Sequence, residues 1–143
     1  MGARMQVLSN ISELLADMHE AGYAHRDVKP ANVVWMPFEN RWSVIDFGCA
    51  ARIGSRAPLT FSLTYAAPEV LAAAELDAEV VEVFPEVDVW AFGVMTFELL
   101  TCVPAYRIHS HGINKVSAPD QHILASQDFC PCCRAMSCRA IYR

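Results

Sequence analysis

The chain has 143 residues, of which 54% are hydrophobic and 19% charged, and its formal net charge is −5 at pH 7. This length fits one domain or part of one, and the apolar content is enough for a core. Because the eleven Lys and Arg residues are scattered among sixteen Asp and Glu residues, we expect no nucleic-acid partner. The most apolar run, residues 89–103, is shorter than the roughly 18 residues of a membrane helix and contains Glu98, so we expect no membrane partner.

The six Cys residues bear on the cellular compartment. The N-terminal segment contains no apolar stretch of the kind that forms a secretory signal. The thiols are therefore interpreted as reduced, and we expect an intracellular protein, cytoplasmic or nuclear.

The first predicted element is a helix over residues 6–21. Apolar residues recur there at steps of three and four, at Val7, Leu8, Ile11, Leu14, Leu15 and Met18. Residues 23–32 are predicted to form a loop, because Pro30 interrupts a helix and favours an extended residue before it. Residues 33–36 and 42–45 predict two short strands joined by a turn, which form a hairpin.

The second half of the chain is less regular. Residues 49–66 are predicted to be irregular, a short helix is expected over residues 70–74, and the acidic residues 75–86 are expected to be solvated. Asp88 is predicted to cap a following helix that is apolar nearly all round, which indicates burial on most sides. From about Arg107 the sequence shows no clear period.

The predicted hairpin brings chemically useful side chains together. Because an antiparallel hairpin joins its two open ends, Asn32 before the first strand is expected near Asp46 after the second. An amide oxygen and a carboxylate suit a hard cation such as Mg²⁺. Asp27 adds a carboxylate able to accept a proton from an attacking hydroxyl, and Lys29 adds a cation for a phosphoryl group. Together these residues predict a phosphoryl-transfer site.

Four motifs follow one another along the chain: His25-Arg26-Asp27-Val28-Lys29-Pro30-Ala31-Asn32, Asp46-Phe47-Gly48, Ala67-Pro68-Glu69, and Asp88-Val89-Trp90 with Gly93. In this order and spacing they resemble the catalytic loop, the metal-binding motif, the end of the activation segment and the long buried helix of eukaryotic-type Ser/Thr protein kinases. The resemblance covers about residues 5–106. It implies a fold that is mainly α with a small β-hairpin, similar to the C-terminal lobe of a protein kinase.

The resemblance also implies roles for the matching residues. Asp27 would be the catalytic base, and Lys29, two residues later, is typical of the Ser/Thr subclass. Asn32 and Asp46 would coordinate Mg²⁺ and thereby bind ATP. Ser62 stands where such kinases usually carry a Thr that contacts the catalytic loop. Structural or regulatory roles are implied for His25, Arg26, Phe47, Gly48, Ser62, Glu69 and Asp88.

Two of these implied roles concern contacts of the catalytic loop. His25 and Asp88 would tie the loop to the buried helix. In this family Arg26 often pairs with a phosphorylated residue of the activation segment. The candidates for that phosphorylation are Ser55 and Thr60.

Several parts of a complete kinase domain are not recognisable in the sequence. The six glycines, at positions 2, 22, 48, 54, 93 and 112, form no G-x-G pattern, and Lys29 and Lys115 are the only lysines. Neither a glycine-rich loop nor a strand Lys for the phosphates is therefore found, and we expect the N-terminal lobe to be absent. In the family Glu69 pairs with an Arg from a further unrecognised region. A buried Glu69 left unpaired is expected to cost several kcal/mol, unless Arg134, Arg139 or Arg143 substitutes for that Arg.

Residues 107–143 are predicted to form a Cys-rich tail of unknown structure. Cys130 and Cys133 have C-x-x-C spacing, and Cys138 with His122 would complete a zinc site. Because no second paired unit accompanies them, an unstructured or aberrantly terminated tail is favoured over zinc binding.

Two functions of different classes follow from the sequence. The first is a protein Ser/Thr kinase that transfers the γ-phosphate of ATP to Ser or Thr hydroxyls of a protein substrate, although the missing lobe argues against autonomous activity. The second is a non-catalytic kinase-lobe fragment that acts as a docking or interaction module. A truncated, non-functional product is a third reading, supported by the change of character near Arg107.

Overall fold

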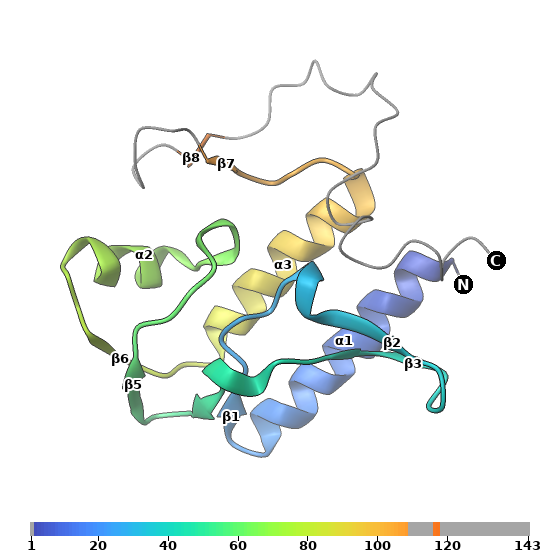
Figure 1. The fold of residues 1–143 in the computed structure, drawn as a ribbon, viewed down its shortest axis with the longest axis horizontal. Coiled ribbons are helices and arrows are strands. Elements are labelled where there is room, and N and C mark those ends of the chain that lie inside the picture. Colours follow the sequence, from blue (N-terminus) through green and yellow to red (C-terminus); the bar gives the residue numbers. More distant parts are fainter. Residues whose placement is uncertain (1, 109–115, 118–143) are drawn as a thin grey trace.

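Figure 1 shows the computed structural model, which describes residues 2–108 and 116–117. Within these residues there are three α-helices and four two-stranded antiparallel sheets. The helices are α1 (Ala3–Glu20), α2 (Pro68–Glu75) and α3 (Glu86–Thr101). The strands are β1 (Tyr23–Ala24), β2 (Val33–Met36), β3 (Arg41–Val44), β4 (Ala51–Arg52), β5 (Arg56–Pro58), β6 (Val80–Glu82), β7 (Arg107–Ile108) and β8 (Val116–Ser117).

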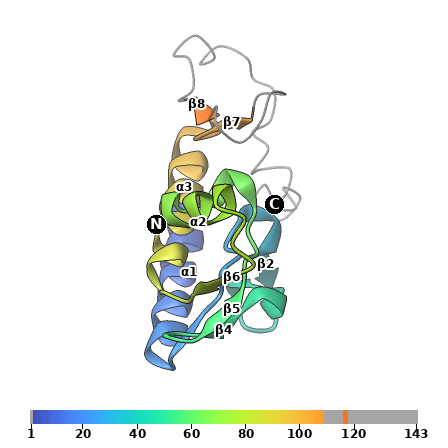
Figure 2. The same cartoon turned by 90° about the vertical axis from the view of Figure 1, so that its left-hand side faces the viewer.

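Helices α1 and α3 lie side by side and antiparallel (Figure 1, Figure 2). Arg4, near the start of α1, donates to the Leu100 carbonyl near the end of α3 at 3.3 Å. At the other end, His19 Nε2 of α1 lies 2.8 Å from the Asp88 carboxylate of α3. The predicted apolar stripe of α1 explains this pairing, since its buried residues are Val7, Leu8, Ile11 and Leu15. They share the main core with Ala91, Met95 and Leu99 of α3.

The hairpin β2–β3 packs on α1 and completes the main core (Figure 1). Its register pairs Val33 with Val44 at the open end, and both residues are buried together with Trp42. Asn10 of α1 fixes the position of the hairpin, because its side-chain oxygen accepts the Trp42 N–H at 3.0 Å. The predicted hairpin is confirmed, and its second strand begins one residue earlier than expected.

Two strand pairs lie in segments that were predicted to be irregular or solvated. Strand β1 pairs with β4, and β5 pairs with β6, which belongs to the acidic segment 75–86. Figure 2 shows β4, β5 and β6 close to one another below α2. The five acidic residues of the acidic segment are exposed, as expected, but the segment also contributes to a core, because Val83 is buried with Ala24 and Ala57 in a second, smaller apolar cluster. Each strand has only two or three residues, too few for a local strand pattern.

Helix α3 begins at Glu86, two residues before Asp88. The prediction that Asp88 is the N-cap is therefore wrong: Asp88 lies inside the helix and is fully buried. The prediction that α3 is buried on most sides is also wrong, because Val89, Phe97 and Leu100 are 61%, 42% and 48% exposed. By helical periodicity these three residues lie on the face opposite the buried one.

Two further predictions concern the membrane and the tail. Among the described helices, none combines the length and the hydropathy that are required to span a bilayer. The considered zinc ligands of the Cys-rich tail, His122, Cys130, Cys133 and Cys138, lie outside the described residues.

Candidate active site

The candidate site is built on the loop between β1 and β2, residues 25–32. The fully buried Asp88 carboxylate of α3 accepts the backbone N–H groups of His25 and Arg26, each at 2.7 Å. The same carboxylate lies 2.8 Å from His19 Nε2. These contacts hold Arg26 with a φ of 68°, a region that non-glycine residues rarely adopt. The loop is thus attached to α3 through its own backbone, with His25 and Asp88 as the two sides of the contact.

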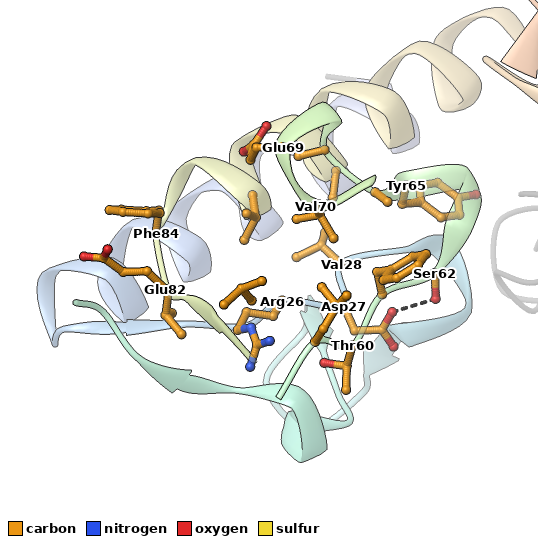
Figure 3. Close-up of a pocket in the computed structure, with 18 residues that line it drawn as sticks. Arg26, Asp27, Val28, Thr60, Ser62, Tyr65, Glu69, Val70, Glu82 and Phe84 are labelled. Carbon is orange, nitrogen blue, oxygen red and sulfur yellow. Dashed lines mark hydrogen bonds between the residues drawn. The ribbon is translucent and has the colours of Figure 1, made fainter. Parts of the chain in front are cut away.

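Asp27 lies at the centre of a hydrogen-bond network (Figure 3). Its Oδ1 accepts from the Ser62 hydroxyl at 2.7 Å, and the Lys29 ammonium lies 2.7 Å from its Oδ2. Lys29 also donates to the Ser62 Oγ at 2.8 Å, and Asn32 Nδ2 donates to Asp27 Oδ2 at 3.0 Å. In Figure 3 the Asp27 carboxylate points towards Ser62 and away from the Arg26 guanidinium. Three other residues singled out in the sequence therefore come together around the Asp27 carboxylate.

These contacts set the charge of Asp27. Burial raises the pKa of the carboxyl, but the hydrogen bonds from Lys29, Ser62 and Asn32 and the positive charge of Lys29 outweigh it. The pKa of Asp27 is therefore held below its ordinary value. At neutral pH the side chain is ionised and accepts hydrogen bonds only. Such a carboxylate is suited to accept a hydrogen bond from a hydroxyl group brought beside it.

The two open ends of the hairpin meet, as predicted. The Ile45 N–H donates to the Asn32 carbonyl at 2.8 Å, directly before Asp46. Asp46 has a φ of 64°, its side chain is exposed, and its Oδ1 accepts the Gly48 N–H at 3.3 Å. A Cβ at Gly48 would lie 3.2 Å from this oxygen, so glycine leaves room for the turn. Asp46 offers carboxylate oxygens and Asn32 an amide oxygen, and this donor set fits Mg²⁺.

His25 connects the loop to the turn at Asp46. Its Nδ1 accepts the Asp27 N–H at 3.3 Å, and its Nε2 lies 3.2 Å from the Ile45 carbonyl. Because an N–H only donates and a carbonyl only accepts, the imidazole carries its proton on Nε2 in this arrangement. Phe47 packs on the same ring, with the two ring centroids 5.1 Å apart.

Arg26 contacts the activation segment, taken here as residues 46–69, through the backbone of that segment. Its guanidinium donates to the Cys49 carbonyl at 3.2 Å and to the Pro58 carbonyl. The two candidate phosphorylation residues are not the partners in these bonds. The Ser55 hydroxyl donates to a neighbouring carbonyl at 2.6 Å, and Thr60 is exposed.

A cavity of about 200 Å³ lies next to Asp27 (Figure 3). Its walls come from the loop, the activation segment, α2, β6 and α3, and include Val28, Tyr65 and Val70. Glu69 also lines this cavity and is exposed in the described part of the chain. Because an exposed carboxylate keeps its hydration, the energetic penalty predicted for a buried, unpaired Glu69 does not apply to this side chain.

One buried polar pair near the site was not predicted from the sequence. The Tyr65 hydroxyl donates to Glu98 Oε2 at 2.7 Å, and Glu98 Oε1 accepts the Ala105 N–H at 3.1 Å. Burial, together with the hydrogen bond to Glu98 and its charge, raises the pKa of Tyr65 far above its ordinary value, so the hydroxyl remains a donor. The available signal was Glu98 itself, an acidic residue within an apolar helix, because a buried carboxylate needs partners.

Comparison with known proteins agrees with the motifs and their arrangement. The family model described as protein kinase domain matches residues 3–134. The chain is 42% identical over 86 residues to the serine/threonine-protein kinase SBK1 of Mus musculus, a match covering 59% of this chain and 20% of that protein. It is 35% identical over 103 residues to an Aurora kinase of Candida glabrata, covering 70% and 26% of the two chains. It is 33% identical over 102 residues to the SNF-related serine/threonine-protein kinase of Homo sapiens, covering 69% and 12%.

The chain thus spans about a quarter or less of the length of these curated relatives. The stretch matched by the family model includes the loop, the hairpin, the activation segment and α3. The chain belongs to the protein kinase domain family, as a member of its eukaryotic-type Ser/Thr group.

Proposed function

We propose that this chain carries the catalytic residues of a protein Ser/Thr kinase that uses ATP and a protein substrate. The observation that carries the proposal is the network around the Asp27 carboxylate, to which Lys29 and Ser62 both connect. In the reaction, the bond between the γ-phosphorus and the β–γ bridging oxygen of ATP breaks, ADP leaves with that oxygen, and a bond to the substrate hydroxyl oxygen forms. The hydroxyl proton passes to the Asp27 carboxylate.

Each residue of the network has a distinct part in this proposal. The ionised Asp27 accepts a hydrogen bond from the substrate hydroxyl and so directs its oxygen towards the phosphorus. Lys29, whose ammonium touches both Asp27 and Ser62, offsets the negative charge on the transferring group. Asn32 and Asp46 would hold Mg²⁺, which would neutralise the negative charge of the ATP phosphates.

The proposal includes the organisation of the chain. Residues 5–106 form part of a kinase domain that corresponds to its C-terminal lobe. The three helices and the hairpin of the described residues support this assignment. An intracellular location, cytoplasmic or nuclear, belongs to the same proposal and rests on the interpretation of the cysteines as reduced thiols.

Binding of Mg²⁺–ATP to the full chain, measured by titration calorimetry, tests the proposal. Asp46→Ala is expected to weaken binding by about tenfold or more, since it removes a carboxylate ligand of the cation. Asp17→Ala is the matched control, because Asp17 is exposed on α1, and it is expected to bind as the wild type does. If the wild-type chain is folded but binds no Mg²⁺–ATP, the proposal that this chain binds ATP is contradicted.

The transfer step is tested separately with a Ser- or Thr-containing peptide and labelled ATP. Asp27→Asn keeps the shape of the side chain but cannot accept the proton, so we expect phosphorylation to fall while nucleotide binding is retained. Equal transfer by Asp27→Asn and the wild type would refute the role of Asp27 as the base.

A non-catalytic interaction module is the second candidate function. It is favoured by two apolar side chains at the candidate site, Ile45 and Phe47, which are 41% and 52% exposed. Neighbouring exposed apolar side chains are typical of surfaces that bind another protein. The two functions differ in their dependence on Asp46, since ATP binding requires its carboxylate and docking through Ile45 and Phe47 does not.

A further inference from the structure

The activation segment is bonded along its middle part to the stretch that connects α2 to α3. Strand β5 of the activation segment pairs with β6, with Arg56 opposite Glu82 and Ala57 opposite Val81. The pairing continues beyond the strands at both ends. The Gly54 N–H donates to the Val83 carbonyl, and the Val83 N–H donates to the Ser55 carbonyl, each at 2.9 Å. The Leu59 N–H donates to the Glu79 carbonyl at 2.9 Å. Residues 54–59 are therefore paired with residues 79–83, and both Gly54 and Ser55 bond to Val83.

Pro58 fits this pairing although it has no N–H. In an antiparallel pair, successive N–H groups point alternately towards and away from the partner strand. Because the Leu59 N–H points towards β6, the position of Pro58 points away, and proline costs no ladder bond there. The same alternation directs the Ala57 and Val81 N–H groups into the ladder and the Val80 N–H out of it.

The pairing is also anchored in apolar contacts. Ala57 of β5 and Val83, which follows β6, are buried together with Ala24 of β1. Ile53 packs against this cluster, and its N–H donates to the Gly22 carbonyl at 2.9 Å. The middle of the activation segment is thus fixed both to β6 and to the strand that leads into the catalytic loop.

Arg26 completes the attachment from the catalytic loop. A phosphorylated residue commonly orders an activation segment by pairing with an arginine. Here the Arg26 guanidinium donates to the carbonyl of Cys49, which precedes the paired stretch, and to that of Pro58, which lies within it. The Arg26 guanidinium is therefore directed to the backbone of the segment, and not to the side chain of Ser55 or Thr60.

We propose that strand β6 and Arg26 together order the activation segment, so that no phosphorylated residue is needed to hold Ser62 against Asp27. This inference rests on the proposed kinase function, because it concerns the geometry of the same site. Phosphorylation at Ser55 or Thr60 would then act on a segment that is already ordered. The device depends on the stretch between Glu69 and Asp88, which supplies β6.

Amide hydrogen–deuterium exchange of the full chain tests this inference. The protein is produced in bacteria, and mass spectrometry establishes that it carries no phosphate. In the wild type, the ladder amides of Gly54, Ala57 and Leu59 are expected to exchange at least about a hundredfold slower than in an unstructured peptide. Val81→Pro removes an N–H that points into the ladder and is expected to raise exchange in residues 54–59 by about tenfold or more.

Val80→Pro is the matched control, because the N–H that it removes points away from β5, and exchange of residues 54–59 should stay within about twofold of the wild type. Exchange of the α1 amides, recorded in the same experiment, reports whether the rest of the chain stays folded. If Val81→Pro unfolds the whole chain, Val81→Gly replaces it, with an expected increase of about threefold confined to residues 54–59.

Two results would overturn the inference: an unprotected activation segment in the unphosphorylated wild type, or equal exchange in Val80→Pro and Val81→Pro when both are folded. The experiment needs neither nucleotide nor phosphotransfer. A chain that fails to bind ATP but shows the expected protection would contradict the proposed function and leave the ordering by β6 standing. A chain that binds ATP but leaves the activation segment unprotected would contradict the ordering by β6 and leave the proposed function standing.

Discussion

Replacement of Asp88 tests how the candidate site is attached to the core. The carboxylate is fully buried and accepts the N–H groups of His25 and Arg26, each at 2.7 Å. Asp88→Ala leaves one buried and one partly buried N–H without an acceptor, and each such group costs about 1–3 kcal/mol. We therefore expect the free energy of unfolding to fall by about 3 kcal/mol, a large share of the roughly 5–15 kcal/mol of an ordinary domain.

Urea denaturation followed by tryptophan fluorescence measures this loss, because Trp42 is buried beside α1. Asp88→Asn keeps the side-chain volume but has one acceptor oxygen in place of two, so its loss is expected to lie between those of the wild type and Asp88→Ala. Asp17→Ala, at an exposed position of α1, is the control and should change stability by less than about 0.5 kcal/mol. An Asp88→Ala chain as stable as that control would refute the reasoning.

Three further changes test other parts of the structure. Tyr65→Phe removes the hydroxyl bonded to the buried Glu98 and is expected to lower the free energy of unfolding by about 1–3 kcal/mol, measured by urea denaturation; an unchanged midpoint would contradict the bond. Because the pKa of Asp27 is lowered in the folded state, its stabilising contribution is present above the unfolded pKa and lost as the pH falls through the folded one. Thermal melts between pH 7 and pH 3 should therefore show a smaller loss for Asp27→Asn than for the wild type, and parallel profiles would contradict this. Ile11→Ala in the core is expected to cost about 2–5 kcal/mol by calorimetry, whereas Leu76→Ala, at an exposed position, should cost little; equal effects would contradict the assigned core.

The elements that the sequence predicted correctly are those with local signals. Helix α1 has a repeated apolar stripe from Val7 to Met18, although it begins at Ala3 and so before the predicted start at residue 6, and the hairpin has two short apolar runs on either side of a turn. The pairing of β5 with β6 has no such signal, because its partners are more than twenty residues apart and neither strand exceeds three residues. Pairing of this kind is decided by tertiary packing, here the burial of Val83 against Ala57.

The candidate site was predictable to the extent that its residues belong to continuous motifs. Asn32 and Asp46 were expected near each other from hairpin geometry, and the bond between the Ile45 N–H and the Asn32 carbonyl fits that expectation. Asp88 was assigned to the wrong local role because an Asp before an apolar run is typical of an N-cap. Only the three-dimensional fold brings the backbone of His25 to this carboxylate, so no local rule identifies the contact.

The contacts of His25 link the relative positions of Asp27 and Asp46 to the core of the fold. Its imidazole accepts the Asp27 N–H and lies within bonding distance of the Ile45 carbonyl, next to Asp46. Its backbone N–H is held by Asp88 of α3, which in turn packs against α1. The two carboxylates that would handle the proton and the cation are therefore connected through one ring that is fixed to the centre of the fold. A change in α3 acts on both carboxylates together, and for that reason substitution of Asp88 should affect stability and site geometry in the same variant.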